Sequence, residues 1–177
     1  QDAYQVPAGG LWEIDVKAQG CSVEIAPGDP GSQVSVVLER KNDQKLQLEV
    51  YQEEEELKIR ATKRGLIPSA KQDAVLRVSI PSDYRGGFSF GKLDLEQSLG
   101  DTSLTFAEVA GYIEVENSLG NVDLYFPPNS PIQINSASSL GEIHRNLQHS
   151  GSGQAFGPLY QVEIASSMGS VSLNDAE

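Results

Sequence analysis

The sequence predicts an all-β protein in which a strand-rich N-terminal section continues into a short C-terminal β-solenoid with a repeat of about 20 residues. Three observations lead to this fold class. Apolar and polar residues alternate in many short runs, 17 glycines and 9 prolines stand largely between those runs, and a Ser-x-Gly tripeptide recurs through the second half. We expect a single continuous domain over residues 1–177, with the N-terminal β section in 1–86, the solenoid repeats in 87–177, and little helix.

The first half is predicted to form six strands. In Leu46, Leu48 and Val50, apolar residues alternate with Gln and Glu, as expected where one face of a sheet packs on a core and the other faces water. The segment Pro27–Gly31 is a strong turn signal, and residues 62–73 are expected to form a longer loop. The predicted strands are Leu11–Val16, Cys21–Ala26, Val34–Arg40, Leu46–Tyr51, Leu57–Ala61 and Val75–Ile80.

The second half carries the repeat. Apolar residues follow each repeat glycine at even spacing, as Leu104 follows Gly100 and Leu124 follows Gly120. The unit is therefore a turn and one strand, about ten residues long, and two units are expected to make one coil. The tripeptides begin at Ser89, Ser98, Ser118, Ser139 and Ser167, and Gly100, Gly120, Gly141 and Gly169 are separated by 20, 21 and 28 residues, with Gly91 and Gly111 between coil halves.

Glycine is expected to form each corner of the coil, where a positive φ or a close backbone approach excludes a Cβ. Apolar residues at even offsets then point inward and stack on the next coil, so that Leu104, Leu124 and Ile143 should adjoin. The residues just before the glycines, Leu99, Leu119, Leu140 and Met168, are expected to fill the corners from inside, while Asp94, Glu96, Ser103, Glu114, Glu116 and Asp123 face water.

The ends and irregularities of the solenoid follow from the same pattern. Coils bury their apolar rows only against neighbours, so the strands of residues 11–80 are expected to close the N-terminal end. Pro127, Pro128 and Pro131 should stiffen one corner, and the gap before Gly169 implies an insertion at 149–157. Arg145 occupies an inward phase, which predicts an irregular last coil.

Composition excludes several functions. With 13 Lys and Arg against 25 Asp and Glu the net charge is −12, which disfavours binding to nucleic acid and to anionic lipid. No stretch approaches the roughly 18 apolar residues that span a bilayer. Because the chain begins with Gln1, we expect an export signal or anchor to have been removed from its precursor. Cys21, the only cysteine, and Trp12, the only tryptophan, are both predicted to lie in the core.

No catalytic, cofactor-binding or metal-binding residue is assigned. Asp94, Glu114 and Asp123 suggest a carboxylate ladder for Ca²⁺, but the Gly-Gly-x-Gly-x-Asp nonapeptide is absent and a wet strand face shows the same alternation. Ser89 stands in a Gly-x-Ser-x-Gly spelling, but a nucleophile elbow needs a following helix and alternating strand follows here. The two histidines, His144 and His149, are too few for a metal site.

A carbohydrate-active enzyme remains the alternative from a different class, because solenoids can place two acids on one face. Nothing distinguishes a particular pair among the 25 acids. Of the aromatic residues that sugar binding generally uses, only Tyr112 and Tyr125 share the outward phase with these acids.

A strand-rich segment that ends in Val78-Ser79-Ile80-Pro81, followed by repeated Ser-x-Gly-x-apolar-x-apolar units, resembles the bacterial "putative adhesin" or toast-rack family over Leu11–Leu173. That family includes cell-envelope stress proteins of the LiaF and LiaG type. The resemblance implies a β-solenoid-like domain displayed at the bacterial cell envelope, without enzymatic activity and without catalytic residues to transfer.

The expected function is therefore a non-enzymatic scaffold or interaction module of the bacterial envelope, extracellular or surface-anchored, whose partner is an envelope protein or a cell-wall component. A sensor domain that docks on a membrane signalling partner is a further alternative. We also expect that this chain can form a homo-oligomer, because the last coil of a solenoid exposes unpaired backbone groups that a second copy can pair with.

Overall fold

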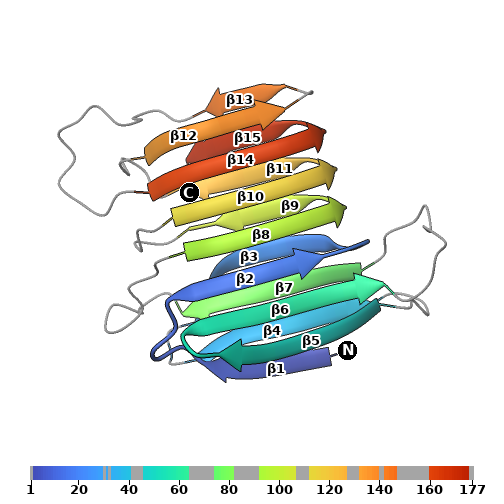
Figure 1. Cartoon of the computed structure of the whole chain (residues 1–177), viewed down its shortest axis with the longest axis vertical. Coiled ribbons are helices and arrows are strands. Elements are labelled where there is room, and N and C mark those ends of the chain that lie inside the picture. The colour runs from blue at the N-terminus through green and yellow to red at the C-terminus, as the bar shows by residue number, and fades with distance from the viewer. Residues whose placement is uncertain are drawn as a thin grey trace.

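The chain folds into two mixed β-sheets that lie face to face (Figure 1). The structure, a computed structural model, describes residues 2–29, 31, 33–40, 46–63, 74–81, 92–106, 112–126, 132–139, 142–146 and 160–175. Within these ranges it contains fifteen strands and no helix, so the predicted all-β class is confirmed. A membrane-spanning helix is accordingly not found in the described ranges.

The fifteen described strands are divided between the two sheets, and most neighbouring strands are parallel. Sheet A has eight strands in the order β1 (Asp2–Pro7), β4 (Gln33–Arg40), β7 (Ala74–Pro81), β3 (Ser22–Gly28), β9 (Thr102–Thr105), β11 (Val122–Phe126), β15 (Val171–Asp175) and β13 (Ile143–Asn146). Sheet B has seven, in the order β12 (Ile132–Ser139), β14 (Tyr160–Met168), β10 (Tyr112–Leu119), β8 (Lys92–Leu99), β2 (Glu13–Ala18), β6 (Glu56–Lys63) and β5 (Leu46–Glu53). Only the pairs β1–β4, β4–β7 and β5–β6 are antiparallel.

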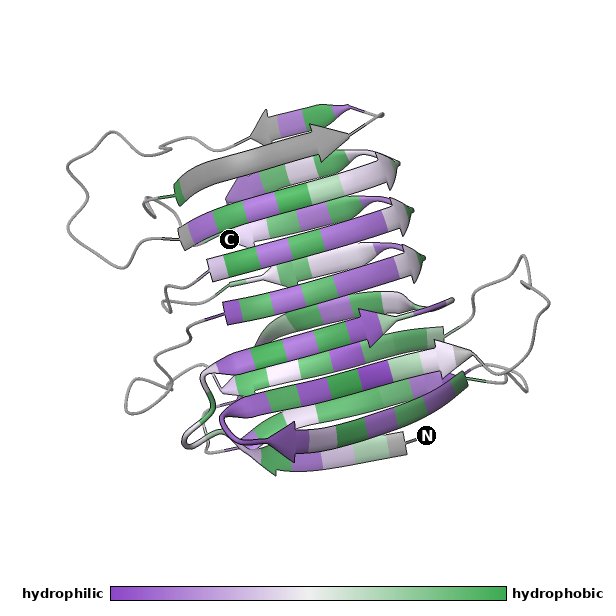
Figure 2. Ribbon diagram, viewed as in Figure 1, coloured by the Kyte–Doolittle hydropathy of each residue, from purple (hydrophilic) through white to green (hydrophobic). Residues whose placement is uncertain are grey.

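The core lies between the sheets and is built from apolar rows that run across the strands. Figure 2 shows apolar and polar residues alternating along most of the coloured strands, and such alternation sends one set of side chains inward. Because the parallel strands pair without a register shift from β6 to β14, the inward residues of one strand meet those of the next. The buried rows are Leu57, Ile14, Leu93, Ile113 and Val162, then Ile59, Val16, Leu95, Val115 and Ile164 in sheet B, and Val78, Ile25, Leu104, Leu124 and Leu173 in sheet A.

Glycine forms the corner where a sheet B strand passes into a sheet A strand. Gly100, Gly120 and Gly169 have φ values of 143°, 125° and 127° and follow one another in the stack. A Cβ on Gly120 would overlap the carbonyl oxygen of Gly100 and lie 2.6 Å from its carbonyl carbon, and a Cβ on Gly169 would meet Gly120 in the same way. The predicted role of glycine is confirmed at these three corners.

The interior of the corner is polar, contrary to the prediction that Leu119 and Met168 fill it. Their side chains are 42% and 57% exposed. The chain bends at the glycine, so the preceding residue falls on the outside of the bend. Gln97 and Asn117 are buried beneath it instead. Gln97 donates to the carbonyl oxygen of Cys21 at 2.8 Å, and Asn117 donates to that of Gly120 at 2.7 Å, so each buried amide hydrogen-bonds a backbone carbonyl at the corner.

A second ladder ties the outer side of the corners together. The carboxylate of Asp101 accepts a hydrogen bond from the backbone N–H of Asn121 at 2.9 Å, and the side-chain oxygen of Asn121 accepts one from the N–H of Ser170 at 3.0 Å. Each turn therefore satisfies a backbone donor of the next turn in the stack.

The order of the strand pairs in space differs from their order in the sequence. Leu104 lies beside Leu124 as predicted, but Leu124 is followed by Leu173 of β15, and β13 lies beyond β15. The prediction that Ile143 adjoins Leu124 is wrong, because β14 and β15 are inserted between the second coil and β12 and β13. Ile143 pairs with Val171. Each of these two residues stands two positions after a repeat glycine, Gly141 and Gly169 respectively.

The N-terminal section is continuous with both sheets. Strands β2 and β3 pair in parallel with β8 and β9 in mid-stack, while β5 closes one end of sheet B and β4 and β1 close one end of sheet A. The strand β1 is not among the predicted strands, and β6 extends by two residues into the predicted loop at 62–73. Trp12 is 50% exposed rather than buried, because β2 begins only at Glu13 and Leu11 takes the buried position.

Several expectations concern residues outside the described ranges. These include the glycines Gly91, Gly111 and Gly141, Leu140, the proline corner Pro127, Pro128 and Pro131, the 149–157 insertion, and the Gly87–Gly91 motif with Ser89. Of the last coil, the backbone of Arg145 pairs with Leu173.

Candidate functional site

No group of three or more His, Cys, Asp or Glu side chains in the described ranges is placed to hold a metal ion. His144 is exposed on β13 and lies 3.0 Å from the Glu142 carboxylate, while His149 is outside the described ranges. Cys21 is buried as predicted, and burial raises the pKa of its thiol to about 12, so the thiol is protonated and unreactive at neutral pH.

The proposed carboxylate ladder is divided between the two sheets. Asp94 and Glu114 are partners on β8 and β10 of sheet B, whereas Asp123 lies on β11 in sheet A. The Lys92 ammonium stands beside the first two, 3.3 Å from the Glu114 carboxylate and 4.0 Å from that of Asp94. A lysine already occupies the position that a cation bound to these carboxylates would need.

The outward side of β2, β8, β10 and β14 forms an acidic face. It carries two lysines, Lys17 and Lys92, and seven carboxylates, Glu13, Asp15, Asp94, Glu96, Glu114, Glu116 and Glu163. Burial and the nearby carboxylates of Asp15 and Glu114 raise the pKa of Asp94 to about 6. Repulsion within this face is partly offset by its lysines and by Arg60 of the neighbouring strand β6, which forms an ion pair with the Asp15 carboxylate at 3.1 Å.

The two tyrosines that share the outward phase lie on opposite faces. Tyr112 is on the acidic face, where a hydrogen bond to the Glu163 carboxylate raises the pKa of its hydroxyl to about 12. Tyr125 is on β11 in sheet A, between Thr105 and Asn174. The structure therefore does not bring them together as a sugar-stacking pair.

The outward side of sheet A differs in chemistry from the acidic face. Its strands place Gln5, Ser35 and Ser79 side by side on β1, β4 and β7. Further along, Thr105, Tyr125 and Asn174 form a similar row on β9, β11 and β15. Both rows consist of amides and hydroxyls, so this side of the molecule offers many uncharged donors and acceptors.

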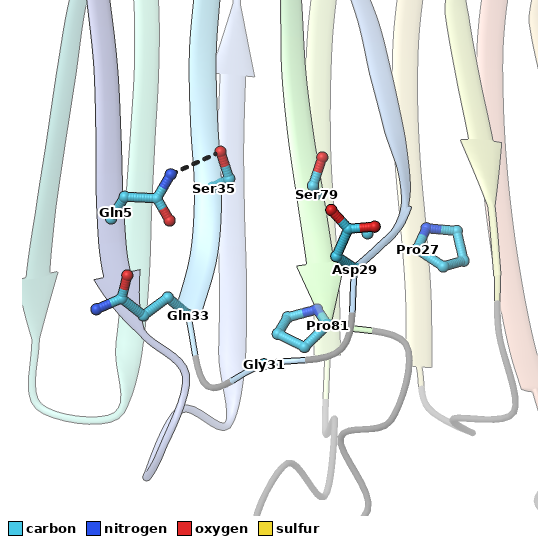
Figure 3. Close-up of a pocket in the computed structure, with 9 residues that line it drawn as sticks. Gln5, Pro27, Asp29, Gly31, Gln33, Ser35, Ser79 and Pro81 are labelled. Atoms are coloured by element: carbon cyan, nitrogen blue, oxygen red, sulfur yellow. Dashed lines mark hydrogen bonds between the residues drawn. The ribbon is translucent and has the colours of Figure 1, made fainter.

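A hollow of about 640 Å³ opens at one end of the first row, and we call it the sheet A pocket (Figure 3). It lies where β3 leaves the sheet and the chain returns into β4. Its lining residues are Gln5, Pro27, Gly28, Asp29, Gly31, Gln33, Ser35, Ser79 and Pro81. Gln5 Nε2 donates to Ser35 Oγ at 3.1 Å, and among the described lining residues one side chain, that of Asp29, is charged.

Sequence reasoning did not identify this pocket. The sequence predicts a turn at Pro27–Gly31, but Pro27 and Gly28 belong to β3. Gln5 belongs to a strand that the sequence does not predict, and Ser35 and Ser79 are 44 residues apart in the chain. Their meeting depends on the antiparallel pairing of β4 with β1 and β7, for which the sequence carries no local signal.

Comparison with known proteins defines the fold further. No sequence profile of a protein family matches the chain, and no curated protein sequence matches it. The crystal structure of a "putative cell adhesion protein" from Clostridium sporogenes is similar over 99% of each chain, with a TM-score of 0.61 and 8% sequence identity. Two structures of a "putative adhesin", from Bacteroides fragilis and Parabacteroides merdae, align over 99% of this chain and 96% of theirs at 10% identity, with TM-scores of 0.28 and 0.27, too low to support an argument. The predicted resemblance is thus confirmed at the level of fold.

Proposed function

We propose that this chain is a non-enzymatic, adhesin-like interaction module of the bacterial cell envelope, built as a short β-solenoid whose repeat is about 20 residues long. It is exported or surface-anchored, and it contacts an envelope protein or a cell-wall component through its outward strand faces. One continuous domain spans the chain. The observation that carries the proposal is the fold shared with the Clostridium sporogenes "putative cell adhesion protein" over 99% of both chains.

The surface of the molecule supports a binding role. The two outward faces are broad arrays of side chains on rigid, paired strands, so they can contact an extended partner with little loss of conformational entropy. The faces also differ, because the sheet B face is predominantly acidic, whereas the sheet A face combines rows of hydroxyls and amides with the ion pairs of Arg77 to Glu24 and Glu39. A non-enzymatic role is supported by Cys21, whose thiol is buried and protonated, and by the placement of Asp123 in a different sheet from the Asp94 and Glu114 pair.

The test is capture from the envelope with two variants that mark the two faces. The purified chain is immobilised and incubated with cell-wall sacculi and, separately, with a detergent extract of bacterial membranes. Glu114→Lys reverses a charge on the acidic face, and Ser103→Lys adds one on the outward face of sheet A. Both positions point outward on paired strands, so both variants should fold.

We expect capture from at least one fraction and loss of that capture in one of the two variants. Failure to capture anything from either fraction contradicts the proposal. Release of reducing sugar from a broad glycan panel supports the carbohydrate-active alternative and overturns the non-enzymatic assignment. Capture of a single integral membrane protein, with none of the sacculi, favours the sensor alternative of the LiaF and LiaG type.

Self-association is part of the proposal. Among the described residues, sheet A ends in β1 and β13 and sheet B in β5 and β12, and each of these strands pairs with one neighbour. An open strand edge can pair with a second copy. Sedimentation velocity at increasing protein concentration tests this, and a single monomeric species at all concentrations argues against it.

A further inference from the structure

The sheet A pocket gathers hydroxyl and carboxamide side chains from three adjacent strands and from the chain that follows β3. Three of its polar side chains come from adjacent strands: Gln5 from β1, Ser35 from β4 and Ser79 from β7. Asp29 and Gln33 stand at the ends of the segment that joins β3 to β4 (Figure 3). Paired strands therefore form one side of the pocket, and residues that follow β3 and begin β4 form the other side.

The lining selects an uncharged, hydroxyl-rich ligand. Carboxamides and hydroxyls both donate and accept hydrogen bonds, and the Asp29 carboxylate accepts them, which matches the hydroxyl groups of a sugar. No Lys or Arg is among the lining residues that the structure describes, so an anionic ligand gains no charged donor and meets the Asp29 charge. Ser35 and Ser79 are directly opposed across an antiparallel pair, about 5 Å apart at Cα, so two hydroxyls can address neighbouring ligand groups.

The backbone keeps the pocket open. A Cβ on Gly28 would lie 2.9 Å from the Cβ of Ser79, so only glycine allows the end of β3 to pass this closely beside β7. Pro27 and Pro81 flank this point and present ring carbons against which the C–H face of a pyranose can pack. Because their φ angles are already restricted, little entropy is lost when a ligand binds.

We propose that the sheet A pocket binds an uncharged saccharide unit, with Ser79, Ser35 and Asp29 as its principal hydrogen-bonding groups. This inference deepens the proposed function, on which it rests, by naming the ligand class at one position of one face. The pocket is open and polar, and its described lining residues include no aromatic side chain, so a single sugar should bind with a dissociation constant on the order of 1 mM. Useful avidity then requires several linked sugars or several copies of the chain.

The test is a titration of the ¹⁵N-labelled full chain, followed by amide chemical shifts. The probes are glucose, galactose, mannose and N-acetylglucosamine, with glucuronate and glucose 6-phosphate as anionic counterparts. We expect at least one neutral sugar to shift the amides of Gly28, Asp29 and Ser79, and the anions to bind about tenfold more weakly. No shift at these amides with any neutral sugar at about 50 mM overturns the inference, as does tighter binding of an anion.

Variants locate the binding. Ser79→Ala and Asp29→Asn should each weaken binding of the sugar about tenfold, and Ser103→Ala, on β9 of the same face but outside the pocket, should leave it unchanged. Native dispersion of the amide spectrum checks that each variant is folded. Equal binding by wild type, Ser79→Ala and Asp29→Asn overturns the assignment, because the sugar is then held elsewhere.

The outcomes separate this inference from the function on which it rests. If sacculi or membrane extract are still captured while sugars leave Gly28, Asp29 and Ser79 unshifted, the pocket inference is wrong and the envelope role stands. If sugars bind at the pocket but neither envelope fraction is captured, the envelope role is wrong and the pocket inference stands.

Discussion

Replacing Gly120 with alanine should destabilise the protein more than an alanine substitution at either of two other glycines. Gly120 has a φ of 125°, a conformation that L residues rarely adopt, and its missing Cβ leaves room for the backbone of Gly100 in the neighbouring coil. An alanine Cβ would overlap the Gly100 carbonyl oxygen. The obstacle is backbone that is itself paired, so rotation of a side chain cannot relieve it.

The magnitude follows from two contributions. The φ value alone costs roughly 1–3 kcal/mol for a residue with a Cβ. Moving the two corners apart strains the hydrogen bonds from Gly100 N to Leu119 O at 3.0 Å and from Gly120 N to Met168 O at 3.1 Å, each worth about 1 kcal/mol. We expect the free energy of unfolding to fall by about 3–5 kcal/mol, a large share of the 5–15 kcal/mol typical of a domain.

Urea denaturation followed by far-ultraviolet circular dichroism measures this change. Two glycines serve as controls. Gly10→Ala has a φ of 82° but no atom within 4 Å of the new Cβ, so it isolates the conformational cost. Gly31→Ala has neither a positive φ nor a close neighbour and should change stability by less than about 0.5 kcal/mol. If Gly120→Ala costs no more than Gly10→Ala, the coils do not stack through this corner and the interpretation is refuted.

Three further predictions concern single side chains. The pKa of Asp94 is raised to about 6, so its ionised form destabilises the fold above that pH, and the stability of the protein rises as the pH falls from 7 toward 4. Asp94→Asn should therefore stabilise the protein by about 1–2 kcal/mol near pH 7.5 and give no gain near pH 4, as measured by urea denaturation. Asn117→Ala removes the bond to the Gly120 carbonyl and should cost about 1–3 kcal/mol, whereas Ser118→Ala, which is exposed, should be neutral. Cys21 should resist maleimide in the native protein and react only in denaturant, and labelling at the native rate of an exposed thiol contradicts its burial.

Local pattern was sufficient for the strands and for the glycine corners. Apolar alternation in Leu93 and Leu95, or in Leu46 and Leu48, depends only on side chains two residues apart, which a strand sends to the same side. A glycine that recurs 20 residues later, as Gly120 does after Gly100, indicates a shared backbone constraint in the same way.

Pattern failed where neighbours in space are distant in sequence. Leu119 and Met168 have the inward phase of their strands, yet the chain bends at the next glycine and leaves them in solvent, so a polar residue two positions earlier fills the corner. Ile143 has the right phase for an inward row, but its phase does not reveal that β15 separates its strand from β11.

By itself, the sequence determined the all-β class, most strand positions, the side of each strand that faces the core, the corner glycines and the burial of Cys21. Only the tertiary structure decided the order of the coils, the division of Asp94 and Asp123 between opposite faces, and the pocket that Gln5, Ser35 and Ser79 share. The physical reason is that the backbone geometry between adjacent residues sets which side chains of a strand face the core. Which strands pair with one another depends on contacts between residues far apart in the sequence, and many apolar strands are similar enough that only the complete fold distinguishes them.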